Sequence, residues 1–376
     1  MQTLHTYLLS GPQYDVLPPA NTPQYGALAP HFGRLGIGIE EATPVWPSDS
    51  LFAALVAQAA LLGAEGAQFI AAMTKQDGEP LLRHSSLFPR IGNLVLLPRP
   101  ALPRPVSKPR VSDAAEGTKD AKAFKKLRYL SPGLFKEACK GEDLQSLAHV
   151  VLQDGEVWVS EEEARGLSEE WRFHTSNGKG RREQIAGAKI WHYASEPHVT
   201  VDRASSASAY YEAGRVFFAP GCGLALLTTK QDTFFERLLE LLGEGGIGGR
   251  RSVGNGAFSW THGDELKFNE GGERVVTLSR FLPRGAVEIE VIRDEHSRYQ
   301  LVEVGGWTTT SESASFRRKE VTMLAEGAVL AKCVRGTVVD VRSDTFLTAT
   351  TTPHPIYRSG LALTVPLGVK EDEHGA

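Results

Sequence analysis

A glycine-rich stretch in the second half of the chain is the feature that most constrains its fold. It reads GEGGIGGRRSVGNGAF over residues 243–258, with seven glycines and two adjacent arginines in sixteen residues. The segment before it, 232–242, carries apolar residues at helical spacing, and the residues AFSW that end the stretch and follow it are typical of a strand. The predicted order is therefore helix, glycine loop, strand.

This order argues against the folds that bind nucleotides through glycine-rich loops. Gly243, Gly245 and Gly248 satisfy G-x-G-x-x-G, but that fingerprint follows a strand and opens a helix. The chain also contains no G-x-x-x-x-G-K-[ST] sequence. A helix C-cap requires only one glycine, which accounts for Gly243. The other glycines either pack closely on their own sheet or leave room for another backbone, such as that of a nucleic acid.

The composition is that of a globular protein of two or three domains, with 376 residues, 41% hydrophobic and 23% charged. The net charge of −4 does not by itself predict nucleic-acid binding, so an RNA site must depend on local basic patches. Cys139, Cys222 and Cys333 form no C-x-x-C pattern, which argues against a zinc site or a disulfide framework. We identify no membrane-length apolar run and no signal-peptide pattern, so we expect a cytoplasmic protein.

The order of predicted elements indicates an α+β fold. A strand at Thr3–Ser10 precedes a helix with Ser48 or Asp49 as its N-cap, and a second helix begins near Asp232 with a capping box of Thr233 and Glu236. Two strands between the helices, in PHVTVDRAS and GRVFFAPGCGLALLTT, and a last strand in AFSW complete a βαββαβ order. This is the ferredoxin-like (RRM-like) arrangement, an antiparallel sheet with helices on one face.

We therefore predict a ferredoxin-like domain over 1–270, interrupted by an insertion at about 85–195, and a second strand-rich domain, a degenerate ferredoxin-like one, over 271–376. In the insertion, the segment 99–128 holds nine basic and three acidic residues. We expect hairpin-like parts there and no second compact core, although a plain solvated loop is the alternative. AVEIEVIRDE, over 286–295, is among the predicted strands of the C-terminal domain.

Several stretches resemble one known family, in order over nearly the whole chain. They are HFGRLGIGIEEATPVWPSDSLFAALVA, SSLFPRIGNLVLLPRP, KAFKKLRYLSPGLF, VTVDRASSAS, GGIGGRRSVGNGAF, TLSRFLP and HPIYRSGLALTV. Together they are similar to the RAMP-superfamily subunit of type III-A (Csm-type) CRISPR effector complexes that caps the 5′ handle of the guide RNA. The resemblance implies a non-catalytic, RNA-binding scaffold in antiviral defence, without metal or cofactor. Its partners would be the guide RNA, the large polymerase-like subunit and the backbone subunit, and its insertion would contain a thumb-like hairpin.

The resemblance and the residue types together predict an RNA-binding surface. The loop residues Gly245, Gly246, Gly248, Gly249 and Ser252 would let the RNA backbone approach, while Arg250 and Arg251 supply charge, unless one of the two pairs internally with a carboxylate. His31 and Phe32 would stack on bases and Arg34 would meet a phosphate, although core roles for His31 and Phe32 are equally open. The remaining candidates are basic: Lys108, Lys125, Lys126 and Arg128 along the guide, and Arg203, which either braces the glycine loop or touches RNA.

Two further alternatives stay open. His354 and Arg358 are either site residues or fold residues that pack the C-terminal sheet. The rival function is a metal-independent endoribonuclease that processes the guide precursor, because related RAMP proteins carry out this chemistry. Such an enzyme needs a general base and acid, and His31 is the one plausible base in a motif region. A metal-dependent nuclease has weaker support, because the histidines are scattered along the sequence.

Overall fold

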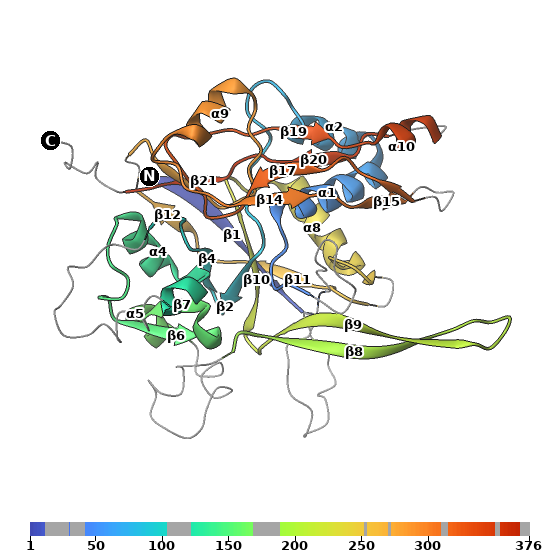
Figure 1. Ribbon diagram of the computed structural model, residues 1–376, viewed down its shortest axis with the longest axis horizontal. Coiled ribbons are helices and arrows are strands. Elements are labelled where there is room, and N and C mark those ends of the chain that lie inside the picture. The colour runs from blue at the N-terminus through green and yellow to red at the C-terminus, as the bar shows by residue number, and fades with distance from the viewer. Residues whose placement is uncertain are drawn as a thin grey trace, which may run out of the picture.

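The computed structural model describes residues 1–11, 30, 42–103, 122–167, 189–251, 254–269, 272–309, 315–349 and 354–368. Helices and several separate sheets make up the molecule, which confirms the predicted α+β class (Figure 1).

A six-stranded antiparallel sheet forms the centre of the first domain. Its order is β11-β1-β10-β2-β3, and β12 also pairs with β1. All seven residues of β10 are buried, as expected for a central strand with both faces covered. The bounds are β1 Gln2–Ser10, β2 Phe88–Ile91, β3 Leu94–Val95, β10 Cys222–Thr228, β11 Ser259–His262 and β12 Leu266–Phe268.

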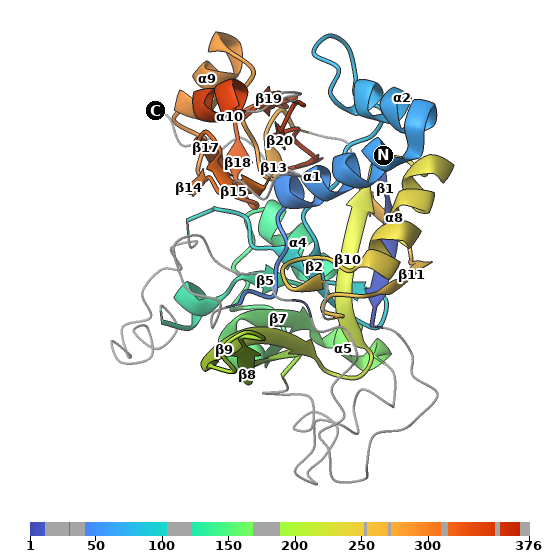
Figure 2. The same ribbon diagram turned by 90° about the vertical axis from the view of Figure 1, so that its right-hand side faces the viewer.

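The helices α1 (Ser48–Ala59) and α8 (Thr233–Gly245) pack against each other beside this sheet (Figure 2). The apolar face of α8 is buried at helical spacing, as predicted, through Phe235, Leu238, Leu239 and Leu242. The predicted caps are wrong. Asp232 caps α8 by accepting from the Phe235 N–H at 3.0 Å, and Glu236 instead accepts a hydrogen bond from the Tyr7 hydroxyl at 2.9 Å. Pro47 precedes α1, so Ser48 and Asp49 both lie inside that helix.

The helical segment Ser48–Met73 is 26 residues long and contains an 18-residue window with a mean hydropathy of 1.5, which by length and composition alone is enough to cross a membrane. Our sequence reasoning did not identify it as such a run. In the structure the segment is divided into α1, a 3-10 turn (Ala60–Leu62) and α2 (Gly63–Met73), with Gly63 at a φ of +61°. Leu51, Phe52 and Leu55 of α1 lie in the core, but only 28% of the apolar window is buried within the structure.

The two strands predicted between the helices are partly wrong. The second strand of the central sheet is β2, with the sequence FPRI, which lies inside the predicted insertion. Residues 197–201 instead belong to β8 (Trp191–Val201), which pairs with β9 (Ser208–Phe218) in a separate hairpin. Four residues that include a proline and an arginine are too few to produce a clear alternation, whereas the alternating pattern of β8 arises in a strand whose distal half is largely exposed.

Part of the insertion forms a small folded unit, whose described buried residues belong to the core of the first domain and not to a separate one. Its sheet has the order β4-β5-β7-β6, covered by α4 and α5. Leu130, Phe135 and Trp158 are buried in it and join the core of the first domain. We call residues 97–167 the insertion subdomain. Its elements are β4 Leu97–Pro98, β5 Tyr129–Leu130, α4 Pro132–Cys139, β6 His149–Leu152, β7 Val157–Ser160 and α5 Glu161–Gly166.

The C-terminal region consists mainly of short strands in small sheets. AVEIEVIRDE, predicted as a strand, is the helix α9 (Ala286–Arg293). Its alternation is misleading because Val291 and Ile292 pack together on a small core while Val287 is exposed. The other elements are β13 Val275–Thr277, β14 Leu301–Val304, β15 Trp307–Thr309, β16 Ser315–Arg317, β17 Val321–Leu324, β18 Val329–Leu330, β19 Val338–Asp340, α10 Asp344–Ala349, β20 Tyr357–Ser359 and β21 Thr364–Pro366.

A buried ion cluster attaches α1 to the C-terminal strands. Asp49 has no exposed surface, and its carboxylate accepts from Arg280 at 2.9 Å and from Arg358. Arg358 also donates to the Gly305 carbonyl at 3.1 Å. Arg358 is therefore a fold residue, one of the two predicted alternatives. His354 is exposed, with its ring 5.8 Å from that of Phe346.

Candidate nucleic-acid interface

The glycine loop closes on itself between the end of α8 and the start of β11. The Phe258 N–H donates to the Gly243 carbonyl at 3.0 Å, and the Ile247 N–H donates to the Gly256 carbonyl at 2.9 Å. These two bonds hold the first and last parts of the loop side by side. The chain order of helix, glycine loop and strand is as predicted.

Three of the seven glycines are required by this folding. A Cβ atom on Gly243 would lie 2.3 Å from the Phe258 carbonyl oxygen, and one on Gly246 would lie 2.4 Å from that of Asn255. At Gly256 the distance to the Ile247 carbonyl oxygen would be 2.0 Å. Real Cβ atoms do not approach carbonyl oxygens so closely, so packing within the loop explains why these three positions are glycine. One of them is Gly246, which was predicted to meet RNA.

The other described glycines lie at the surface of the loop. Gly245 and Gly249 are exposed, and a Cβ atom on Gly245 would meet nothing within 4 Å. Gly248 is half-buried at a φ of +84°, a conformation that favours glycine. Internal packing does not explain the glycine at position 245. The predicted approach of an RNA backbone therefore concerns Gly245, Gly248 and Gly249.

Arg250 links the glycine loop to the hairpin of β8 and β9. Its guanidinium donates to the Tyr211 hydroxyl at 2.8 Å and lies over the Tyr211 ring, 5.0 Å from the ring centre. The predicted internal contact of one arginine is therefore present, but with a tyrosine in place of a carboxylate. The charge of Arg250 is not neutralised by this contact. The neighbouring Arg251 is exposed.

The hairpin is the most extended part of the molecule (Figure 1). Its strands have eleven residues each, which corresponds to about 33 Å from root to turn at about 3.3 Å per residue. Tyr211 stacks on the cross-strand His198, with ring centres 5.4 Å apart and an interplanar angle of 16°. Exposed apolar side chains lie on the other face: Tyr193, Val199, Val201 and Tyr210.

Sequence reasoning missed these aromatic residues. The available signal was the strand pattern of SAYYEAGRVFF, in which adjacent tyrosines must point to opposite faces. Tyr211 accordingly faces the glycine loop, and Tyr210 lies on the opposite face with 64% of its surface exposed. Exposed aromatic rings are the groups on which single-stranded bases stack.

The predicted basic residues that the structure describes lie in two places, on the insertion subdomain and in the turn of the hairpin. Lys125, Lys126 and Arg128 are exposed on the insertion subdomain, and Arg128 pairs with Glu156 at 3.5 Å. They adjoin Tyr129, whose ring contacts Trp191 edge-on at the hairpin root, with centres 6.1 Å apart.

Arg203 lies at the opposite end, in the exposed turn between β8 and β9. The residue that braces the glycine loop is Tyr211 and not Arg203, so the first of the two roles predicted for Arg203 is wrong. His31, Phe32, Arg34, Lys108 and Ser252 lie outside the described residues.

Both the sequence and the fold of this chain are similar to those of known proteins. Residues 270–367 match the family model of the CRISPR Csm4 C-terminal domain. No curated protein matches the sequence. A chain in the crystal structure of a Csm3–Csm4 subcomplex of the type III-A CRISPR-Cas interference complex shares 18% identity with a TM-score of 0.60, covering 97% of this chain and 99% of that one.

A second similar structure is a Csm1–Csm4 cassette in complex with cA4. It shares 16% identity with a TM-score of 0.52, covering 98% of this chain and 99% of that one. At these identities the likeness concerns the fold. The domain match over residues 270–367 and this likeness in fold both agree with the resemblance seen in the sequence.

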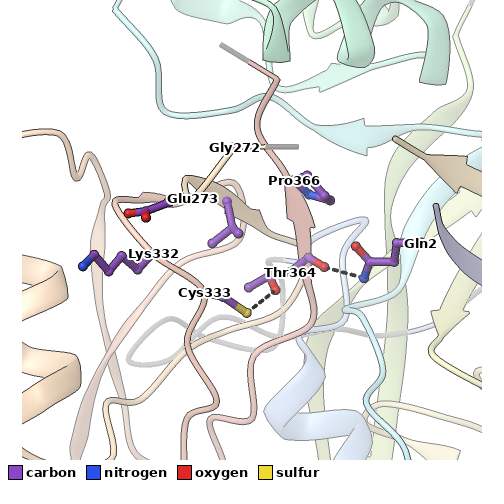
Figure 3. Close-up of a pocket in the computed structure, with 8 residues that line it drawn as sticks. Gln2, Gly272, Glu273, Lys332, Cys333, Thr364 and Pro366 are labelled. Atoms are coloured by element: carbon purple, nitrogen blue, oxygen red, sulfur yellow. Dashed lines mark hydrogen bonds between the residues drawn. The ribbon is translucent and has the colours of Figure 1, made fainter. Parts of the chain in front are cut away.

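Among the described residues, no three His, Cys, Asp or Glu side chains are grouped as metal ligands. A shallow pocket of about 670 Å³ lies where Gln2 of β1 donates to the Thr364 carbonyl of β21 (Figure 3). Glu273 and Lys332 lie on the far side of this pocket from Gln2. The pocket thus lies at the contact between β1 and the C-terminal strands.

Proposed function

We propose that this chain is a non-catalytic guide-RNA-binding subunit of a cytoplasmic type III-A CRISPR interference complex. It would anchor the 5′ handle of the guide and bridge the large subunit to the backbone subunits, in the manner that the Csm1–Csm4 and Csm3–Csm4 structures suggest for their own chains. The match of residues 270–367 to the Csm4 C-terminal domain supports this role.

The finer fold assignment belongs to the same proposal. Numbered within the βαββαβ unit, the strand order β11-β1-β10-β2 is 4-1-3-2, with antiparallel neighbours throughout. We assign this unit to the ferredoxin-like fold, with the insertion subdomain and the hairpin between its second and third strands. The hairpin would be the thumb, although it starts near the end of the predicted insertion and extends beyond residue 195.

One observation carries the RNA-binding proposal: an arginine whose described side-chain partner is a neutral tyrosine joins the glycine loop to a hairpin with exposed aromatic rings. Arg250 contacts only the hydroxyl and ring of Tyr211 among the described contacts of its side chain, and Arg251 is exposed beside it. Gly245 and Gly249 leave the adjacent backbone accessible. These three features suit a single-stranded RNA. Its phosphates can bind the charge and the open backbone, and its bases can stack on the aromatic rings.

The test measures how the affinity for a 5′-handle RNA oligonucleotide depends on salt. Alanine at both Arg250 and Arg251 removes two phosphate contacts, so the slope of log K against log salt is expected to fall by about 1.4, or about 0.7 per contact. The matched control removes two exposed arginines of the C-terminal region, Arg293 and Arg317, whose side chains are 71% and 67% exposed. Equal slopes in the two double variants would contradict the proposal.

The same oligonucleotide separates the binder from the ribonuclease. In the presence of a chelator, the protein is expected to bind the RNA and leave it intact. Cleavage at one phosphodiester that disappears in His31→Ala would instead identify a metal-independent nuclease, since loss of a proton-transfer group lowers rates by about 100- to 10,000-fold.

A further inference from the structure

The root of the hairpin is held by one buried side chain from the insertion subdomain, Gln153. Its amide oxygen accepts from the Ile190 N–H at 2.8 Å and from the Trp191 N–H at 3.2 Å. Its amide nitrogen donates to the Trp191 carbonyl at 3.0 Å. Only 6% of the surface of Gln153 is exposed, so these bonds are shielded from water.

The turn that carries Gln153 has an unusual backbone. Gln153 and Asp154 have φ values of +50° and +54°, and Gly155 follows at +101°. The left-handed region is disfavoured for residues other than glycine, and here two such residues are consecutive. Such a conformation persists where surrounding contacts hold it. Here it directs the Gln153 amide at the backbone that enters β8.

The described attachments of the hairpin to the body are of different kinds, and they include a backbone bond from the Val216 N–H of β9 to the Pro30 carbonyl at 3.2 Å. At the root, Gln153 binds backbone groups of Ile190 and Trp191, and Trp191 is itself buried against Tyr129. Further along, Tyr211 contacts the Arg250 side chain. The root attachment fixes where the hairpin leaves the body, and the contact of Tyr211 with Arg250 sets how close it lies to the glycine loop.

We infer that Gln153 is a positioning residue that sets the direction of the hairpin and thereby the distance between its Tyr211 face and the glycine loop. This inference rests on the proposed function only in what the hairpin binds. The hydrogen bonds between Gln153 and the hairpin root are a property of the protein alone. The basic residue Lys126 also packs its alkyl chain over Gly155 of the same turn, so one short segment positions both the hairpin root and part of the basic surface.

The test measures the hairpin directly in the full-length protein. Cys333 is exposed, whereas Cys139 and Cys222 are buried, so a spin label on Cys333 and a second on Ala204→Cys in the hairpin turn report one distance. Gln153→Met keeps the length of the side chain and removes all three hydrogen bonds. We expect a shifted or broadened distance distribution, and amide exchange at Ile190 and Trp191 about 10- to 100-fold faster.

Two further variants separate the amide from the strained turn. Gln153→Glu keeps the acceptor for the two N–H groups and loses the donor, so exchange at Ile190 and Trp191 is expected to stay within about threefold of wild type. Asp154→Asn is the matched control: it tolerates the left-handed conformation and removes only the exposed ion pair with Lys189, whose atoms are 3.3 Å apart. We expect no change in the distance distribution for this control.

An unchanged distance distribution in Gln153→Met would overturn the inference. So would faster exchange throughout β1 and β10 in both Gln153 variants, because Gln153 would then support the whole fold and not the hairpin. Binding of the 5′-handle RNA is measured on the same proteins, and a misdirected hairpin is expected to weaken it about three- to tenfold through lost preorganisation. A displaced hairpin with unchanged RNA affinity would support the positioning role of Gln153 and contradict the role of the hairpin in the proposed function.

Discussion

At the domain junction Arg280 and Arg358 contact the carboxylate of Asp49, whereas in the glycine loop Arg250 contacts the hydroxyl and ring of Tyr211. The first pair of arginines is largely removed from water, with Arg358 3% exposed and Asp49 fully buried. Arg250 is half-buried at the edge of a loop. A buried charge needs an opposite charge, but a charge at the surface can be oriented by neutral groups and remain available.

This difference separates arginines that build the fold from arginines that suit a ligand. In the Asp49 cluster the arginines pair with a carboxylate inside the protein. The cluster joins Asp49 to residues that lie 231 and 309 positions further along the chain. Tyr211 fixes the direction of the Arg250 guanidinium without supplying a negative charge. Among the described residues no carboxylate contacts the Arg250 guanidinium, so a phosphate that approached the loop would meet an oriented cation there.

The largest effect is expected at the Asp49 cluster. Asp49→Ala leaves two arginines near a buried site without their shared carboxylate, which we expect to lower the free energy of unfolding by about 3–5 kcal/mol. Urea unfolding followed by circular dichroism measures this change. The control is Glu290→Ala, which removes an exposed partner of Arg293 and should change stability by no more than about 1 kcal/mol. Similar unfolding midpoints for the two variants would contradict the assignment of Asp49 to the fold.

The second prediction compares two glycines of the loop. Gly256→Ala places a methyl group 2.0 Å from the Ile247 carbonyl at a φ of +71°, so we expect a loss of about 1–3 kcal/mol. Gly245→Ala meets nothing within 4 Å in the last turn of α8 and should leave stability unchanged or slightly improved. If RNA lies on this surface, Gly245→Ala should nevertheless weaken binding of the 5′-handle oligonucleotide.

Thermal unfolding and RNA titration of both glycine variants test this prediction. Full RNA affinity in a stable Gly245→Ala protein would mean that the RNA backbone does not approach the loop at position 245. A stable Gly256→Ala protein would mean that the loop does not close on itself as described.

The sequence predicted the parts of the fold that depend on neighbours in the chain. Helix α8 was predictable because Phe235, Leu238 and Leu242 recur at the helical period. The loop after it was predictable because its glycines are visible in the sequence itself. The strand β2 was not predicted, because its four residues form a strand only by pairing with β10, more than 100 positions later in the chain. Helix α9 was misread because alternation in a short segment fits both periods.

The candidate site was predictable to the same extent. Arg250 and the surface glycines stand out within one short stretch, but Tyr211 lies 39 positions away, and its contact depends on how β9 passes the loop. Gln153 gave no signal at all, since a single glutamine next to Asp-Gly is typical of an ordinary turn. Its role depends on a strained backbone and on residues 37 and 38 positions further along. Contacts of this kind are set by tertiary packing, which local patterns do not encode.

The smallest effect is expected at the contact between Arg250 and Tyr211. Tyr211→Phe removes the hydroxyl that accepts from Arg250 and keeps the ring under the guanidinium, so we expect a stability loss of about 1 kcal/mol or less. The charge of Arg250 stays in place, so the salt slope of RNA binding should be unchanged.

Tyr211→Ala also removes the ring and should weaken RNA binding more, because Arg250 then loses its orientation. Thermal unfolding and salt-dependent RNA titrations of both variants, beside Arg250→Ala, rank the three. If Tyr211→Phe lowered the salt slope as much as Arg250→Ala, the hydroxyl would be needed to hold the charge toward phosphate, and the view that the ring alone orients Arg250 would be wrong.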